Sequence, residues 1–146
     1  MGITKFPGFL SLPGFGEMLN TGVCGAVRPG FHTGEVVMPA LVRAFRGDDE
    51  ITLPSGNSGR LVTVKEPVLS PAEKLAIPGE FVDMECFPQA FWAGNEKIPF
   101  HCLKVISDTV GTETGISAHV SSLGAVLPVL TESVEKLVKN LVEKGV

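Results

Sequence analysis

The sequence predicts an α/β fold, a three-layer αβα sandwich around a mixed, largely parallel central sheet. Short runs of β-branched and apolar residues alternate with turns rich in glycine and proline, while two later segments repeat their apolar residues with helical spacing. The composition of the 146 residues, 44% hydrophobic and 19% charged, is typical of a folded globular chain. A chain of this length buries enough surface for one core, so we expect a single domain over residues 1–146.

The first half of the chain predicts strands joined by polar loops. A short strand at 17–19 should lead into a loop at 20–25, whose two glycines let the backbone turn tightly or approach a ligand. Strand-like runs follow at 35–42 and 61–64, because β-branched residues suit a pleated surface. The polar, turn-rich stretch 47–60 between them predicts an exposed loop.

The second half predicts a strand, a helix and a second strand. Residues 80–84 and the apolar run 100–106 are predicted as strands, with a helix over 86–94 between them. The apolar face of that helix should be formed by Phe87, Ala90, Phe91 and Gly94. This spacing is typical of a βαβ unit with parallel strands and a right-handed crossover. A last amphipathic helix, over 128–143, should cover the sheet or present its apolar stripe to another subunit.

Charge, hydropathy and cysteine count exclude several classes of function. Twelve basic and sixteen acidic side chains give a net charge of −4 without a lysine or arginine cluster, so we expect no nucleic-acid partner. Proline-glycine pairs at 7–8 and 13–14 interrupt the first apolar run, which predicts neither a secretory signal nor a membrane anchor but a cytoplasmic protein. The three cysteines lack a C-x-x-C pair, so we expect them to be reduced and buried, with no metal and no cofactor: Cys24, Cys86 and Cys102.

Polar residues follow both strands of the predicted βαβ unit. Glu85 comes directly after the first strand, and Ser107 and Asp108 come after the second. Parallel strands end at the same edge of a sheet, where open α/β sheets hold their ligands, so these side chains should reach one small molecule. Each carboxylate also has a purely structural explanation, since Asp108 could cap a following helix and Glu85 could lie in the first turn of one.

Three groups of short motifs occur along this part of the chain. L-N-T-G-V-C-G at 19–25 is followed by G-E-V-V at 34–37, V-D-M-E stands at 82–85, and I-P-F at 98–100 leads to K-V-I-S-D at 104–108. Together they resemble the nucleoside phosphorylase superfamily, in particular its methylthioadenosine/S-adenosylhomocysteine nucleosidase branch. Any one motif alone is a weak signal, and their order makes the resemblance more specific.

The resemblance implies a nucleoside site and a role for each residue in it. It implies that Met84 and Glu85 hold the ribose, with Glu85 accepting hydrogen bonds from the sugar diol. It implies that Asp108, after Ser107, protonates N7 of the leaving purine. The glycine loop of the family matches Thr21, Gly22, Val23, Cys24 and Gly25. Cleaving an N-glycosidic bond builds positive charge on the sugar and negative charge on the base, so a carboxylate and a carboxylic acid suit the two ends.

The resemblance also implies that this chain lacks the family's N-terminal portion, with 1–18 an atypical N-terminal segment. A sheet without its N-terminal strand has an exposed edge, which predicts a homo-oligomer, most simply a dimer, with Phe6, Phe9 and Phe15 at or near the contact. Hydrolysis is favoured over phosphorolysis because the arginines form no recognisable phosphate motif.

Three functions remain open at the level of the sequence. The first is a nucleosidase that cleaves the N-glycosidic bond of a purine nucleoside or a related nucleoside. The second is a non-catalytic nucleoside-binding module that retains the fold. The third is a structural or oligomeric protein whose sheet edge or apolar face pairs with another subunit. Release of a free base separates the first from the others, and thermal stabilisation by a nucleoside separates the second from the third.

Overall fold

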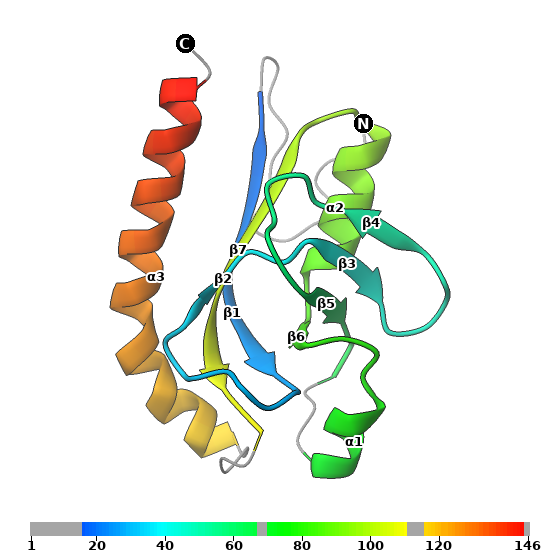
Figure 1. Ribbon diagram of the computed structural model, residues 1–146, viewed down its shortest axis with the longest axis vertical. Coiled ribbons are helices and arrows are strands. Elements are labelled where there is room, and N and C mark those ends of the chain that lie inside the picture. The colour runs from blue at the N-terminus through cyan, green and yellow to red at the C-terminus, as the bar shows by residue number, and fades with distance from the viewer. Residues whose placement is uncertain (1–15, 67–69, 111–115, 145–146) are drawn as a thin grey trace.

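The computed structural model describes residues 16–66, 70–110 and 116–144, which form a mixed sheet flanked by helices (Figure 1). The strands are β1 (Met18–Ala26), β2 (Val36–Val37), β3 (Leu41–Ala44), β4 (Glu50–Thr52), β5 (Arg60–Thr63), β6 (Phe81–Asp83) and β7 (Phe100–Asp108). The helices are α1 (Pro71–Ala76), α2 (Cys86–Asn95) and α3 (Ile116–Lys144). The segment that carries Phe6, Phe9 and Phe15 lies outside the described residues.

The seven described strands lie in the order β2-β7-β1-β6-β5-β3-β4. The pairs β1·β7, β3·β5 and β5·β6 are parallel, and β1·β6, β2·β7 and β3·β4 are antiparallel. The long central pairing of β1 with β7, from Met18 opposite Phe100 to Gly25 opposite Asp108, is parallel. Helix α3 packs along β7, β1 and β2, and α2 lies on the other side of the sheet (Figure 1). The predicted three-layer α/β class is therefore confirmed.

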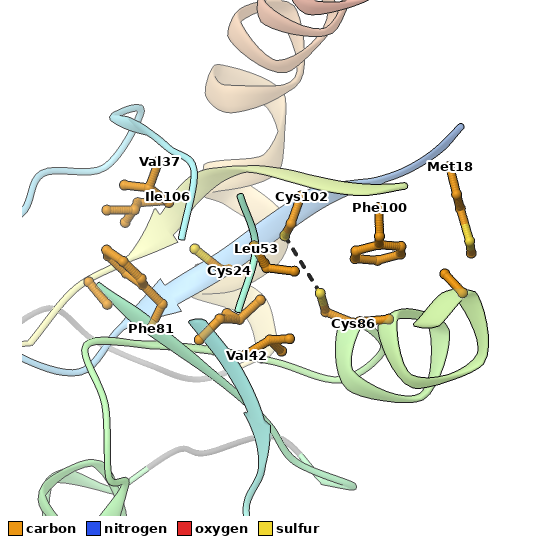
Figure 2. Close-up of a cluster of buried hydrophobic side chains, with 14 residues drawn as sticks. Met18, Cys24, Val37, Val42, Leu53, Phe81, Cys86, Phe100, Cys102 and Ile106 are labelled. Atoms are coloured by element: carbon orange, nitrogen blue, oxygen red, sulfur yellow. Dashed lines mark hydrogen bonds between the residues drawn. The ribbon is translucent and has the colours of Figure 1, made fainter. Parts of the chain in front are cut away.

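The main core lies between the sheet and α2 (Figure 2). Phe81 is fully buried there, and Phe31 packs against it edge to face with ring centroids 4.9 Å apart. Val82 follows Phe81 along β6 and points to the opposite face of the sheet, as the alternation of side chains along a strand requires. It packs there against a second cluster, formed by Val27, Val62, Val64 and Ile77. Burying one large apolar side chain contributes about 1.5–3 kcal/mol, so the two clusters together hold both faces of β5 and β6.

The strand order corrects the predicted βαβ unit. Strand β1 lies between β6 and β7, parallel to β7 and antiparallel to β6, so β6 and β7 run in opposite directions and are not neighbours. Spacing along the chain predicted the three elements, but it could not reveal a strand inserted from about sixty residues upstream. The prediction of a parallel 80–84 and 100–106 pair is wrong.

The predicted glycine loop at 20–25 is also wrong, because these residues continue β1 as a regular strand. Strand β1 pairs with β7 at eight positions, from Met18 to Gly25, with a register shift between Cys24 and Gly25. Glycines that suggested a turn instead let other groups approach the strand. At Gly25 an added Cβ would lie 3.1 Å from Asp108 Oδ2, closer than side chains normally tolerate.

Several boundaries differ from the predictions. The 35–42 run divides into β2 and β3 around the buried Pro39, which lacks an N–H for the ladder. The polar 47–60 stretch contains β4, and α3 begins at Ile116 and passes through Pro128. The short α1 was missed, although S-P-A-E at 70–73 is a capping box in which Ser70 and Glu73 bind each other's backbone N–H groups.

Helix α2 also faces the core differently from the prediction. Its buried residues are small, Cys86, Ala90 and Ala93, whereas Phe91 is 50% exposed. Small side chains let the helix approach the sheet closely, and the aromatic residues lie at its rim, where the Phe87 and Phe91 ring centroids are 6.0 Å apart. Among the described residues no helix has the length and apolar character needed to cross a membrane.

Candidate functional site

The predicted acidic residues flank one stretch of β1 instead of sharing a strand edge. Gly25 lies opposite Asp108 on β7 and opposite Val82 on β6. Strand β6 is antiparallel to β1, so after Val82, which pairs with Gly25, the chain runs back along β1 in the direction of Gly22. Glu85 follows β6 in that direction. The single-edge prediction is therefore wrong, and the residues 22–25 separate the two carboxylates.

Asp108 is half-buried at the end of β7, and its side chain lies next to Gly25 of β1. The Ser107 hydroxyl lies 3.0 Å from Asp108 Oδ1 and 3.3 Å from the Cys24 carbonyl oxygen. Neighbouring side chains of a regular strand point to opposite faces and do not meet. They meet here because the ladder with β1 passes from Ile106 opposite Cys24 to Asp108 opposite Gly25, as at a β-bulge, and bulges re-aim side chains in this way.

A buried lysine on α1 lies near Asp108. Lys74 is 4% exposed, and its ammonium group donates to the Thr109 carbonyl oxygen at 3.3 Å. Burial lowers the pKa of Lys74, and the nearby charge of Asp108 opposes that effect. Arg28 holds this short helix in place by donating to the carbonyl oxygens of Lys74 and Ile77. The sequence reasoning missed Lys74 because it missed α1.

Met84 and Glu85 form the exposed turn between β6 and α2. Met84 is 49% exposed, and Glu85 occupies the N-cap position of α2 without a side-chain capping bond. The amides of Glu85 and Cys86 instead donate to Asp83 Oδ2 at 3.3 and 2.9 Å, and the Phe87 amide donates to Thr63 Oγ1 at 2.9 Å. Capping by other side chains leaves the Glu85 carboxylate at the surface, where a ligand can reach it.

Asp83 is itself held by a buried ion pair. Its Oδ2 lies 3.2 Å from Lys104 Nζ, with both side chains 2% exposed, and its Oδ1 accepts the Thr63 hydroxyl at 2.7 Å. Burial lowers the pKa of Lys104, but the charge of Asp83, the nearby Cys102 and Cys86 and the hydrogen bond to Asp83 together outweigh burial, and the pKa lies above its ordinary value. Lys104 pairs in register with Gly22, where an added Cβ would lie 3.7 Å from Nζ. A Cβ at residue 22 would therefore make only ordinary contact with the lysine.

The three cysteines are buried, as predicted, and two of them touch. Cys86 Sγ lies 3.6 Å from Cys102 Sγ (Figure 2), and Cys102 Sγ lies 3.7 Å from Asn20 Oδ1. The hydrogen bond to Cys102 and burial raise the pKa of Cys86, and burial raises the pKa of Cys24. Both are therefore neutral thiols near pH 7 and poor nucleophiles.

Two surface pockets lie away from the flanking carboxylates. One, of about 380 Å³, lies beside Phe31 and Phe81, and the other, of about 410 Å³, lies between α3 and the first residues of β1. Neither is lined by Met84, Glu85 or Asp108. Within 16–66, 70–110 and 116–144, no group of three or more His, Cys, Asp or Glu side chains could hold a metal ion.

No protein-family model matches the sequence, and no curated protein matches it. Solved structures do match. The Arabidopsis thaliana 5′-methylthioadenosine nucleosidase in its apo form has a TM-score of 0.70 at 20% identity, over 84% of this chain and 61% of that chain. A variant of the Chlamydia trachomatis nucleosidase bound to MTA also has a TM-score of 0.70, at 22% identity, over 85% and 65%.

A third match is the Helicobacter pylori 5′-methylthioadenosine/S-adenosylhomocysteine nucleosidase with butyl-thio-DADMe-Immucillin-A. Its TM-score is 0.74 at 14% identity, over 85% of this chain and 68% of that chain. Of the Arabidopsis structure, by comparison, this chain spans about three fifths of the length. At these identities the likeness concerns the fold, and it shows that the chain has the fold of the methylthioadenosine nucleosidases.

Proposed function

We propose that the chain binds a purine nucleoside or a related nucleoside along residues 22–25 of β1 and cleaves its N-glycosidic bond. The observation that carries the proposal is the pair of carboxylates that flank this stretch. Asp108 lies against Gly25 at one end, and Glu85 stands in the exposed turn toward the other. The fold shared with methylthioadenosine nucleosidases supports the same function.

The two carboxylates suit the two halves of the reaction. Glu85 accepts hydrogen bonds from the sugar diol, and Met84 beside it packs against the sugar. Asp108 gives a proton to the base as the bond between sugar and base breaks, so the base leaves neutral. Water adds its oxygen to the sugar carbon and releases a proton, which restores the acid.

Partners of the arginines support hydrolysis over phosphorolysis. Arg28 donates to backbone carbonyl oxygens at the end of α1, Arg43 donates to those of Ala44 and Gly47, and Arg60 pairs with Glu50. Phosphate binding usually requires an arginine whose donors face the site. These three of the four arginines are engaged elsewhere and Arg46 is exposed in the turn after β3, so water is the acceptor that we propose.

The proposal is tested by release of free base from a panel of purine nucleosides, including 5′-thio derivatives, measured by chromatography. Asp108→Asn should lower turnover by about 10²- to 10⁴-fold with nucleoside binding nearly intact, the effect of losing a general acid. Glu85→Gln should also weaken binding, because Glu85 contacts the sugar before the reaction. Glu135→Gln, on the exposed side of α3, is the matched control and should change neither value.

Each result decides between the candidate functions. If the wild type releases no base from any nucleoside, cleavage is wrong. If a nucleoside nevertheless raises the melting temperature and Glu85→Gln reduces that shift, the chain is a non-catalytic nucleoside-binding module. If neither occurs, the shared fold serves a structural role.

We further propose that the chain forms a homo-oligomer, most simply a dimer. Three apolar side chains on α3 support this: Leu127, Val138 and Val142 are 48%, 45% and 61% exposed. Apolar residues on one helix are commonly covered by another subunit. Sedimentation should detect a dimer that Val138→Lys with Val142→Lys dissociates, and a stable wild-type monomer at high concentration would contradict the proposal.

A further inference from the structure

We infer that Asp83, Thr63 and Lys104 are positioning residues that hold the Met84–Glu85 turn in the conformation that binds the ligand. The inference rests on the proposed nucleoside site, because it assigns the turn its ligand-binding role. It assigns the buried Asp83 and Lys104 and the half-buried Thr63 no contact with the ligand. They act through the backbone that carries Glu85.

The first step is the attachment of the turn to Asp83 and Thr63. Three successive amides, those of Glu85, Cys86 and Phe87, donate to these two side chains. The N-terminus of a helix needs such acceptors for its free N–H groups, and the residue at the N-cap usually supplies them. Here the N-cap residue is Glu85, whose side chain makes no capping bond, so the anchors come from β5 and β6.

The second step is the fixed position of the acceptors. Asp83 Oδ1 receives the Thr63 hydroxyl at 2.7 Å, and Oδ2 lies 3.2 Å from the Lys104 ammonium. Rotation of the carboxylate would break bonds on both oxygens. Because Thr63 also accepts the Phe87 amide, the strand β5, the strand β6 and the first turn of α2 are joined in one network.

The third step is that packing does little to hold the turn. Met84 and Glu85 are both exposed, whereas Asp83 before them and Cys86 after them are buried. A buried ion pair adds little net stability over an apolar pair of similar size, because both charges lose their hydration. Asp83 and Lys104 instead provide a charged acceptor at a defined position, to which the Glu85 amide donates a hydrogen bond.

Thr63 is the best position for a test, because valine has the same shape as threonine and suits a strand. Thr63→Val removes the donor to Asp83 and the acceptor of the Phe87 amide, while Thr63→Ser keeps the hydroxyl. Thr52→Val, on the exposed side of β4, is the control for a threonine-to-valine change outside the network. Two readouts are measured for each variant: amide hydrogen exchange at residues 85–87, and the Kd and KM for the nucleoside that the wild type binds best.

Thr63→Val should speed exchange at 85–87 and weaken nucleoside affinity by about tenfold, the effect of losing a hydrogen bond to a charged group. Thr63→Ser should retain most of both values, and Thr52→Val should retain both. A purely structural role would speed exchange without changing affinity at a temperature where every variant is folded. That result would overturn the positioning role and leave the proposed function intact.

Unchanged exchange at 85–87 in Thr63→Val would also overturn the inference, whatever the affinity. A wild type that neither binds nor cleaves any nucleoside would instead overturn the proposed function, and the positioning role would fall with it. In that case the exchange data would still distinguish a network that anchors the turn from one that does not.

Discussion

The two aspartates at the ends of β6 and β7 have opposite surroundings. Asp83 is enclosed on the α2 side of the sheet, where a lysine, a threonine and two backbone amides bind its two oxygens. Asp108 is half-buried on the other side, beside Ser107, the bare backbone of Gly25 and the buried amine of Lys74. The Asp83 carboxylate has no room for a ligand atom, whereas the Asp108 carboxylate lies next to Gly25 of β1.

This difference is consistent with the proposal that Asp83 has a structural role and Asp108 a chemical one. A carboxylate that is fully hydrogen-bonded to the protein holds its charge and its place. A proton donor needs a side that reaches the substrate. The difference also predicts that substitutions around Asp83 should affect folding first, whereas substitutions around Asp108 should affect the reaction first.

The largest effect is expected from Lys104→Met, which leaves the buried Asp83 charge unpaired. Breaking a buried ion pair by removing one partner costs about 3–5 kcal/mol, so the free energy of unfolding in urea should fall by that order. Adding Asp83→Asn removes the lone charge, and the double variant should recover much of the loss. A simple sum of the two single effects in the double variant would show that the two side chains are not coupled.

A smaller effect is expected from alanine at the two glycines of β1. Gly25→Ala places a Cβ 3.1 Å from Asp108 Oδ2 and 3.2 Å from Val82 Cγ1, so it should cost about 1–3 kcal/mol and displace the carboxylate. Gly22→Ala makes only ordinary contact with Lys104, but its φ of 150° is strained for alanine, at about 1 kcal/mol. Urea unfolding measures both costs. If the two substitutions lower the free energy of unfolding equally and also reduce base release equally, the two ends of the site do not differ as we propose.

The smallest effect is expected in the pH dependence of stability. The pKa of Lys74 is lowered on folding from the ordinary 10.5, so the unfolded chain binds more protons just below that pH, and this lysine makes stability rise with pH there. The raised pKa of Lys104 has the opposite sign, and its contribution is lost as pH rises above 10.5. Lys74→Met should flatten the rise below 10.5 in urea titrations, and an unchanged slope would contradict the assignment.

The sequence predicted those parts of the fold that depend on local pattern. The strands near 61–64, 80–84 and 100–106 and the helix near 86–94 follow from apolar runs, β-branched residues and turn signals close along the chain. Strand neighbours and directions depend on contacts between distant segments, and no local pattern encodes that β1 separates β6 from β7. Glycine was misleading at 20–25, because it permits close approach as well as turning.

For the site, the sequence singled out Met84, Glu85 and Asp108, and their functional roles remain predictions. It did not single out Asp83, Lys104 or Lys74, whose partners lie on other strands or on a helix that was missed. One signal was present: a charged residue inside an apolar strand needs a buried partner. Both Asp83 and Lys104 stand in such runs, so pairing them was possible in principle from sequence alone.

The rate at which a reagent modifies the buried thiols also reports how often the core opens. Cys24, Cys86 and Cys102 come from β1, α2 and β7, and each is at most 2% exposed. A thiol reagent can modify them only after the segment around them opens, and only through the thiolate. The rate of modification, compared with that of a small free thiol at the same pH, therefore reports how often α2 lifts from the sheet. Slower modification when a nucleoside is bound would measure how strongly the ligand closes the helix onto the strands.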